Sequence, residues 1–139
     1  MKKVMFLCTA NSCRSQMAEG LLRHLAGGKV EAHSAGLFAA GVHLRAVQVM
    51  REAGIDISGQ TSKDIDPGLL RRMDYAITLC GHAESSCPAT PPEVRRLHWP
   101  VEDPVGARGT EEEVLKEFRR ARDEIKLRME RFLREEGIK

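Results

Sequence analysis

The most informative stretch of the sequence is Lys3-Val4-Met5-Phe6-Leu7-Cys8-Thr9-Ala10-Asn11-Ser12-Cys13-Arg14-Ser15. Its apolar run over residues 3–7 ends abruptly at polar residues, which predicts a buried strand followed by a loop. A helical pattern begins at Ser15, with apolar side chains four positions apart at Met17, Leu21 and Leu25. Glycines at positions 27 and 28 end this pattern, so a strand, a loop and a helix are expected in succession.

Strands and helices continue to alternate along the rest of the chain. Further strands are predicted over residues 30–34, 75–79 and 97–99; the first is weaker, and the last is a short strand before Pro100. Apolar spacing and capping signals predict helices over residues 44–54, 66–72 and 110–132, the last of them opened by a Thr110/Glu113 capping box. This alternation indicates one α/β domain over residues 1–139, a three-layer sandwich with a central four-stranded parallel sheet.

Bulk composition narrows the possible partners and the compartment. The chain has 139 residues, 42% of them hydrophobic and 30% charged, and a net charge of only +2. These values do not favour a nucleic-acid or membrane partner, and the N-terminal apolar run is too short for a signal peptide. We therefore expect a cytoplasmic monomer, whose four cysteines are catalytic or metal-binding rather than a disulfide framework.

The loop after the first strand has the composition of an oxyanion site. Five residues separate Cys8 from Arg14, which directly precedes the helix. Backbone N–H groups of such a loop can surround a tetrahedral anion, and the Arg14 guanidinium can bind two of its oxygens. The same positive field is expected to lower the pKa of Cys8, and Ser15 can donate a hydrogen bond to the thiolate. The predicted anion-binding residues are Thr9, Ala10, Asn11, Ser12, Cys13, Arg14 and Ser15. The alternative, a buried cysteine beside an incidental arginine, does not explain the position between strand and helix.

Further motifs give the chain a resemblance to a known family. The Cys8-x5-Arg14-Ser15 signature within residues 4–19, Asp103-Pro104, residues 34–36, residues 56–58 and the final helix all contribute to it. Together they resemble the low-molecular-weight protein tyrosine phosphatases and the arsenate reductases built on the same fold. The resemblance implies that Asp103 is a general acid, although an aspartate before Pro104 could also be a simple turn residue.

Cys80 and Cys87 favour the reductase branch of this family. They lie seven positions apart after the third predicted strand, on a Gly- and Ser-containing segment expected to be a mobile loop. This segment resembles the redox segment of thioredoxin-coupled arsenate reductases. Because ligands bind beyond the carboxyl ends of parallel strands, the loops at Cys8, Cys80 and Asp103 should share one edge of the sheet.

The resemblance implies a three-cysteine relay. Cys8 would attack arsenate, Cys80 would attack Cys8 and release arsenite, and Cys87 would then attack Cys80. Thioredoxin would reduce the final disulfide, no cofactor would be tightly bound, and phosphate or sulfate would bind as an arsenate analogue. Weak phosphatase activity is expected, because the first step is shared.

Three other functions are consistent with some of these residues. A tyrosine phosphatase could use the same loop, but no aromatic residue follows Asp103-Pro104 and the single tyrosine, Tyr75, lies in a predicted strand. A thiol-redox or oxyanion sensor would leave Asp103 without a purpose. A zinc site at Cys80, His82 and Cys87 would have wider spacing than is usual for zinc.

One position departs from the family pattern. Some reductases of this family hold potassium beside the loop with residues that match Asn11, Glu19, Ser34 and Thr61, and with an acid two positions after the threonine. That position is Lys63 here. We expect its ammonium to replace or repel the ion, so that no metal is bound and activity does not depend on potassium.

Overall fold

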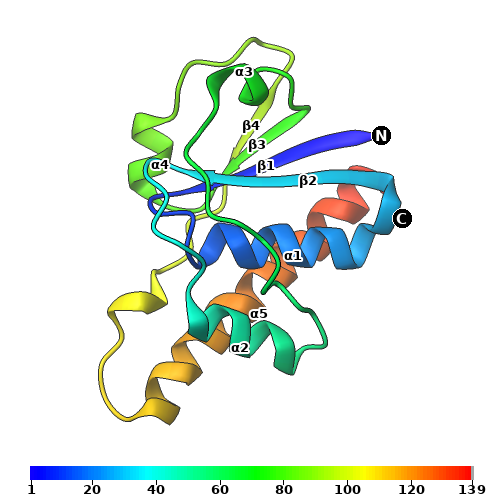
Figure 1. Cartoon of the computed structure of the whole chain (residues 1–139). Helices are drawn as coiled ribbons and strands as arrows, with labels where there is room; N and C mark the ends of the chain where they lie inside the picture. The colour runs from blue at the N-terminus through cyan, green and yellow to red at the C-terminus, as the bar shows by residue number, and fades with distance from the viewer. Residues whose placement is uncertain (139) are drawn as a thin grey trace.

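A four-stranded parallel sheet forms the centre of the computed structural model, which describes residues 1–138 (Figure 1). The strand order is β2-β1-β3-β4, and the strands are β1 (Lys2–Cys8), β2 (Val30–Gly36), β3 (Tyr75–Thr78) and β4 (Arg95–His98). The α-helices are α1 (Arg14–Ala26), α2 (Leu44–Glu52), α3 (Pro67–Leu70), α4 (Gly81–Ser86) and α5 (Glu111–Glu135). Two 3₁₀ turns, η1 (Gly27–Lys29) and η2 (Pro104–Gly106), complete the described elements.

Helices cover both faces of the sheet, because successive residues of a strand point to opposite faces. Val4 and Phe6 of β1 belong to the larger core, which also contains buried side chains of α1, α2 and α5. Met5 and Leu7 belong to a smaller core with residues of α3 and α4. Figure 1 shows the two helix layers on either side of the strands. The predicted three-layer sandwich is therefore confirmed.

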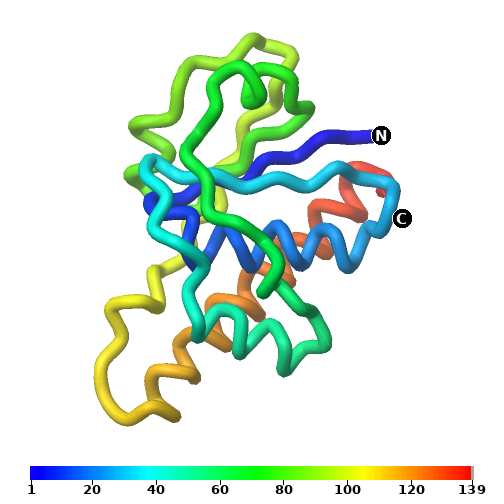
Figure 2. Tube along the Cα trace, viewed as in Figure 1, coloured from blue at the N-terminus to red at the C-terminus, as the bar shows by residue number. Residues whose placement is uncertain are grey.

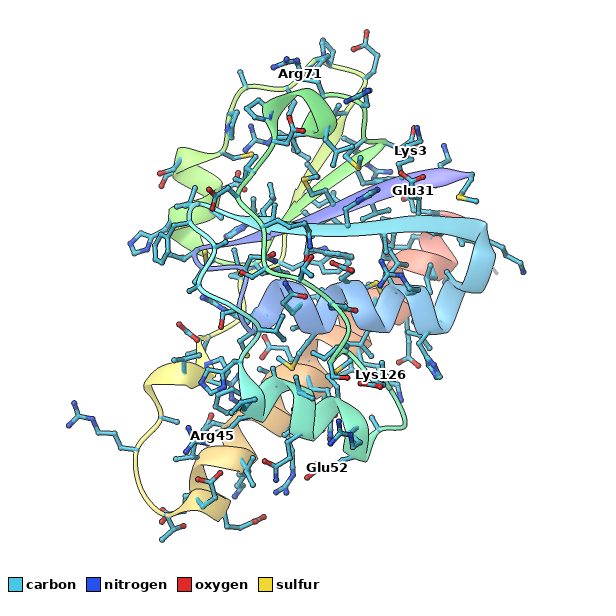
Figure 3. All side chains as sticks on the ribbon, in the orientation of Figure 1. Lys3, Glu31, Arg45, Glu52, Arg71 and Lys126 are labelled. Atoms are coloured by element: carbon cyan, nitrogen blue, oxygen red, sulfur yellow. The ribbon has the colours of Figure 1, made fainter. Side chains whose placement is uncertain are left out.

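Ion pairs on the surface join two helices of the larger layer. Arg45 of α2 lies 2.8 Å from Glu111 of α5, and Glu52 of α2 lies 2.9 Å from Arg119 of α5. Figure 3 shows Arg45 and Glu52 along α2. None of the helices within residues 1–138 is long and apolar enough to cross a membrane.

Two elements differ from the expectation. Strand β4 comprises Arg95–His98 rather than residues 97–99, and as an edge strand it pairs through its backbone with β3 while its arginines stay exposed. The segment after Cys80, described from the sequence as a loop that can move and whose helicity the sequence leaves open, is the helix α4. The Cys80 sulfur accepts a hydrogen bond from the Ala83 N–H at 3.4 Å, so cysteine acts here as the helix N-cap.

The sheet order places the candidate site. β1 pairs with β2 on one side and with β3 on the other, so the chain leaves β1 and β3 beside each other at their carboxyl ends. Such a reversal of strand order opens a crevice where α/β proteins bind ligands. The loops after Cys8 and after Thr78 both begin at this edge of the sheet.

Candidate active site

The loop between β1 and α1 turns its carbonyl groups away from the sheet edge. The carbonyls of Thr9, Ala10 and Ser12 accept hydrogen bonds from the backbone N–H groups of Phe38, Ala40 and His43, in that order. Figure 2 shows this chain segment running beside the loop. Within residues 1–138 the N–H groups of Ala10 to Cys13 have no protein acceptor. A loop of this kind presents its donors to an anion.

Asn11 fixes the shape of the loop. Its φ of 45° lies in the left-handed region, which asparagine tolerates better than most residues. Its Oδ1 accepts from the Lys63 N–H at 2.8 Å, and its Nδ2 donates to Ser15 Oγ at 2.8 Å. Gly36 is required behind it, since a Cβ there would lie 2.6 Å from the Asn11 nitrogen. Asn11 therefore ties the loop to two neighbouring segments from behind.

Ser15 connects this support to the candidate nucleophile. Its Oγ lies 2.7 Å from Cys8 Sγ, and the Asn11 amide donates to the same oxygen. Asn11 uses one acceptor position of this oxygen, and the hydroxyl proton is free to be donated to a Cys8 thiolate. Cys8 itself is buried at the end of β1. Sequence reasoning expected this role for Ser15, and the geometry suits it.

Arg14 and Asp103 lie close together beside the anion loop. Arg14 is 8% exposed and donates to the Val101 carbonyl at 2.8 Å, which holds its guanidinium in place. Its Nη2 lies 3.5 Å from Asp103 Oδ2. The other carboxylate oxygen, Oδ1, accepts from the Val105 N–H at 3.0 Å. The Asp103 carboxylate is thus held in place through Oδ1, and Oδ2 faces Arg14.

Cys80 joins the same pocket from the neighbouring strand. Its sulfur lies 3.2 Å from the Thr9 hydroxyl, so the loop after β1 contacts the N-terminus of α4. A single pocket of about 670 Å³ is lined by Cys8, Cys13, Arg14, Cys80 and Asp103 together with loop backbone. The structure therefore brings together four of the six residues that were predicted to be catalytic, Cys8, Arg14, Cys80 and Asp103, with Ser15 directly behind them.

Cys87 is placed differently. It is the C-cap of α4, half-buried, and packs against the smaller core rather than lining the pocket. Burial raises the pKa of its thiol, the Glu84 carboxylate raises it further, and Arg96 acts in the opposite direction. A helix rises 1.5 Å per residue, so the seven-residue separation along α4 corresponds to about 10 Å. Disulfide formation needs Cα atoms within about 7 Å, so α4 must unfold before Cys80 and Cys87 can bond.

Cys13 has the properties of a structural thiol. It is buried, and burial together with the charges of Asp103 and Cys8 raises its pKa far above the ordinary range. A protonated thiol is a poor nucleophile. Among the four cysteines, Cys13 is therefore the least suited to attack a substrate.

Sequence reasoning gave no role in this pocket to five of its lining residues: Phe38, Ala40, Gly81, His82 and Val105. Phe38 is 56% exposed. Phe38 lies just after β2, and Val105 lies in the 3₁₀ turn η2, which follows β4. Their position after strand ends was the available signal, because isolated apolar residues have no periodicity to reveal them.

Comparison with known proteins decides the family. The family model for low molecular weight phosphotyrosine protein phosphatase matches residues 3–139. The chain belongs to this family. A curated arsenate reductase from Bacillus licheniformis is 55% identical over 131 residues, which cover 94% of each chain. This relative places the chain among the family members named arsenate reductase.

Solved structures agree with this placement. An arsenate reductase in the phosphate-binding state superposes with a TM-score of 0.80 at 41% identity, and the match covers 100% of both chains. A thioredoxin-dependent arsenate reductase from Corynebacterium glutamicum gives a TM-score of 0.69 at 30% identity, covering 94% of this chain and 62% of the other. The resemblance inferred from the cysteine and Asp-Pro motifs is therefore confirmed.

Tyr75 cannot serve as an aromatic platform for a phosphotyrosine substrate. It is buried in β3, and its hydroxyl donates to the Glu136 carboxylate. Burial and this carboxylate raise the pKa of Tyr75 to about 12. The only tyrosine of the chain thus has a structural role away from the pocket.

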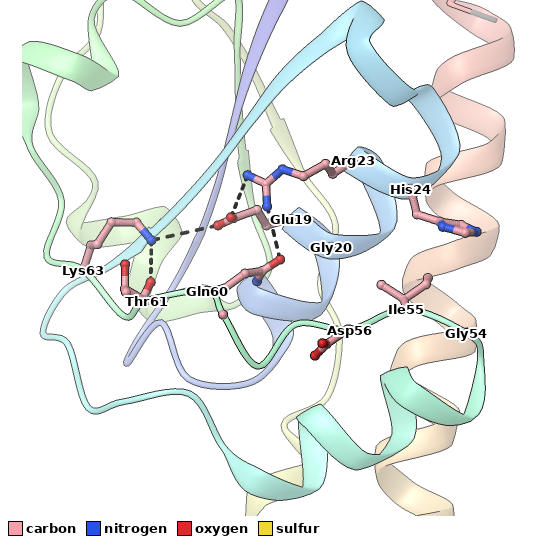
Figure 4. Close-up of a pocket in the computed structure, with 11 residues that line it drawn as sticks. Glu19, Gly20, Arg23, His24, Gly54, Ile55, Asp56, Gln60, Thr61 and Lys63 are labelled. Carbon is pink, nitrogen blue, oxygen red and sulfur yellow. Dashed lines mark hydrogen bonds and ion pairs between the residues drawn. The ribbon is translucent and has the colours of Figure 1, made fainter.

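A second pocket, of about 570 Å³, lies behind the loop and contains Lys63 (Figure 4). Glu19 is buried there; its carboxylate accepts from the Ser34 hydroxyl at 2.6 Å and pairs with Arg23 at 2.9 Å. Lys63 Nζ lies 4.0 Å from Glu19 and donates to the Thr61 carbonyl at 2.5 Å. The ammonium therefore lies between the Glu19 carboxylate and the Thr61 carbonyl, and Ser34 contacts the same Glu19 oxygen.

Proposed function

We propose that this protein reduces arsenate to arsenite through Cys8, Cys80 and Cys87, with thioredoxin as the reductant. The observation that carries the proposal is the shared pocket, in which the sulfurs of Cys8 and Cys80 face the same anion loop. A phosphatase needs only the first of these sulfurs. The curated relatives named arsenate reductase and the thioredoxin-dependent solved neighbour support the same function.

In the first step, the Cys8 thiolate attacks arsenic in an arsenate held by Arg14 and the loop N–H groups. A sulfur–arsenic bond forms and an arsenic–oxygen bond breaks. Asp103 gives its proton to the departing oxygen, which leaves as water. The hydrogen bond from Ser15 to Cys8 stabilises the thiolate before the attack.

In the second step, the Cys80 thiolate attacks the Cys8 sulfur. A disulfide forms, and the sulfur–arsenic bond breaks with its electron pair remaining on arsenic. Arsenic(V) becomes arsenic(III), the two sulfurs are oxidised, and arsenite leaves. The Thr9 hydroxyl at 3.2 Å and the Ala83 N–H at 3.4 Å both stabilise a Cys80 thiolate.

In the third step, Cys87 attacks Cys80 and frees Cys8. This step requires α4 to unfold, because its ends are too far apart for a disulfide. Reduced thioredoxin then supplies two electrons and two protons to the Cys80–Cys87 disulfide. Every group used comes from one chain, and the thiols must stay reduced between turnovers, so we expect a monomer that works in the cytoplasm.

Weak hydrolysis of small aryl phosphates should accompany this activity. Phosphate and arsenate share their tetrahedral geometry, and the attack by Cys8 is the same for both. Water in place of Cys80 would then cleave the phosphocysteine. The missing tyrosine platform argues against phosphotyrosine as the main substrate.

A coupled assay tests the proposal. Arsenate, thioredoxin, thioredoxin reductase and NADPH should give arsenate-dependent NADPH oxidation with the unmodified protein. Cys80→Ser and Cys87→Ser should lose multiple turnovers but keep aryl phosphate hydrolysis, whereas Cys8→Ser should lose both. Absence of arsenate-dependent NADPH oxidation, or normal turnover by Cys87→Ser, would refute the relay.

A further inference from the structure

A cluster of polar side chains ties α4 to the sheet, outside the pocket and unused by the relay. Thr78, the last residue of β3, donates its hydroxyl proton to Glu84 Oε2 in α4. The same hydroxyl oxygen lies 2.8 Å from His98 Nδ1 at the end of β4. The Thr78 hydroxyl has a single proton, which it donates to Glu84. Its oxygen therefore accepts a hydrogen bond from His98 Nδ1. We call Thr78, Glu84 and His98 the α4 clasp.

Thr78 is buried, so its hydroxyl needs the hydrogen bonds that the clasp provides. Thr78 is 1% exposed, and a buried hydroxyl is costly unless it is hydrogen-bonded. Its partners, apart from a long 3.4 Å contact to the Leu97 carbonyl, are Glu84 and His98. His98 Nδ1 also lies 3.7 Å from Glu84 Oε2, so the three groups close on one another.

The helix that the clasp holds has few other attachments. α4 has six residues, which is too short to be stable alone. Its N-terminus is capped by the Cys80 sulfur through the Ala83 N–H, and the Ala83 side chain is buried in the smaller core. When Cys80 bonds to Cys8, the Cys80 sulfur moves away from the Ala83 N–H and no longer caps α4. The clasp then becomes the main polar attachment of α4.

We propose that Glu84, held by Thr78 and His98, is a positioning residue that keeps α4 folded and limits the rate at which Cys87 reaches Cys80. The inference rests on the proposed relay, since only the relay requires α4 to unfold. While α4 is folded, Cys80 stays at the pocket as the N-cap, ready to attack Cys8. Premature unfolding would remove Cys80 from the pocket before arsenate has reacted.

Two test substitutions and two controls separate the clasp from simple charge effects. Thr78→Val keeps the shape and the Glu84 charge but removes the hydroxyl. Glu84→Gln removes the charge, which by itself also acts on the neighbouring Cys87 thiol. Thr78→Ser retains the hydroxyl and should behave like the unmodified protein, and Glu93→Gln removes an exposed acid outside the clasp as a charge control.

The first measurement is hydrogen exchange of the α4 amides in the reduced protein, without arsenate. Loss of the Thr78 hydroxyl in Thr78→Val should raise exchange about tenfold, and Glu84→Gln, which replaces a charge-assisted hydrogen bond by a weaker neutral one, should raise it in the same direction, while the two control variants stay unchanged. Unchanged exchange in Thr78→Val would overturn the proposal. This readout does not depend on whether the protein reduces arsenate.

The second measurement is a single turnover with arsenate, quenched in acid and analysed for disulfides. Thr78→Val should convert the Cys8–Cys80 disulfide to Cys80–Cys87 several-fold faster, with hydrolysis of a small aryl phosphate unchanged. Acceleration in Glu84→Gln alone would mean that charge, not the clasp, controls the step, and would overturn the proposal. No disulfide in the unmodified protein would instead refute the proposed function and leave the exchange result standing.

Discussion

The two carboxylate oxygens of Asp103 have different surroundings. Oδ1 is held by the Val105 N–H, and Oδ2 lies toward Arg14 across the pocket. Asp103→Asn keeps this geometry but has no acidic proton to give to a leaving oxygen. We expect hydrolysis of a phenyl phosphate to slow by about 10²–10⁴-fold.

The dependence on the leaving group checks this role for Asp103. A nitrophenyl leaving group needs little protonation, so the loss in Asp103→Asn should be much smaller for nitrophenyl phosphate than for phenyl phosphate. Asp66→Asn, at the N-cap of α3 outside the pocket, is the control and should leave both rates unchanged. An equal loss on both substrates would mean that Asp103 acts only by shaping the loop.

Cys87 should make the last step of the proposed relay dependent on pH. Its pKa is raised by burial, so at neutral pH the thiol is protonated and only a small fraction is thiolate. Formation of the Cys80–Cys87 disulfide should therefore accelerate as pH rises from 7 to beyond the ordinary thiol value of about 8.5. The measurement is the single-turnover rate of that disulfide at each pH.

Substituting Arg96 tests the titration of Cys87 in a second way. It lowers the pKa of Cys87, whereas the adjacent Arg95 pairs with Glu136 at 2.8 Å. Arg96→Gln should shift the pH–rate curve to higher pH, and Arg95→Gln should not. A flat curve between pH 7 and 9, or equal shifts in the two variants, would contradict this explanation.

At the scale of elements, the segment 60–64 supports the anion loop from behind. Its Lys63 N–H binds Asn11, and its Lys63 ammonium lies beside Glu19, as Figure 4 shows for the side chain. We propose that this ammonium takes the place of the potassium ion that the family resemblance would otherwise imply at this position. Turnover and melting temperature should then be the same in potassium and sodium salts of equal ionic strength. A rise specific to potassium would contradict the proposal.

Helix α5 begins with a complete capping box. Thr110 Oγ1 accepts from the Glu113 N–H at 3.2 Å, and the Glu113 carboxylate accepts from the Thr110 N–H at 3.1 Å. Thr110→Ala should lower the free energy of unfolding by about 1 kcal/mol, because a helix N–H loses its partner. Urea unfolding measures this free energy directly. Thr110→Ser should keep most of the stability, because serine retains the hydroxyl. No change in stability would show that the helix start frays in solution.

The elements themselves were predictable to different degrees. β1, α1 and α5 have strong periodic patterns and caps, and the sequence predicts them nearly at their observed ends. β4 has no apolar run, because Arg95 and Arg96 on this edge strand are exposed and only backbone pairing with β3 defines it. α4 is too short for a pattern, and its cap is a cysteine, which sequence rules do not count as a capping residue.

At the scale of the whole molecule, strand order makes the site. The sequence predicts that the loops after Cys8 and Cys80 leave one edge, and the pairing of β1 with β3 brings them side by side. Long-range contacts such as Thr9 with Cys80, Asn11 with Lys63, or Thr78 with His98 have no sequence signal, since they arise only when separate elements pack. That Cys8, Arg14, Cys80 and Asp103 share one pocket was therefore predictable, whereas these long-range contacts were not.

The central claim is that Cys80 takes Cys8 as its partner before Cys87 acts. The most direct test is to treat reduced Cys87→Ser protein with one equivalent of arsenate, block the remaining thiols in acid, and map disulfides by mass spectrometry. The account predicts a Cys8–Cys80 disulfide and one equivalent of arsenite. Arsenite without this disulfide, or a disulfide between Cys8 and Cys13 in its place, would contradict it.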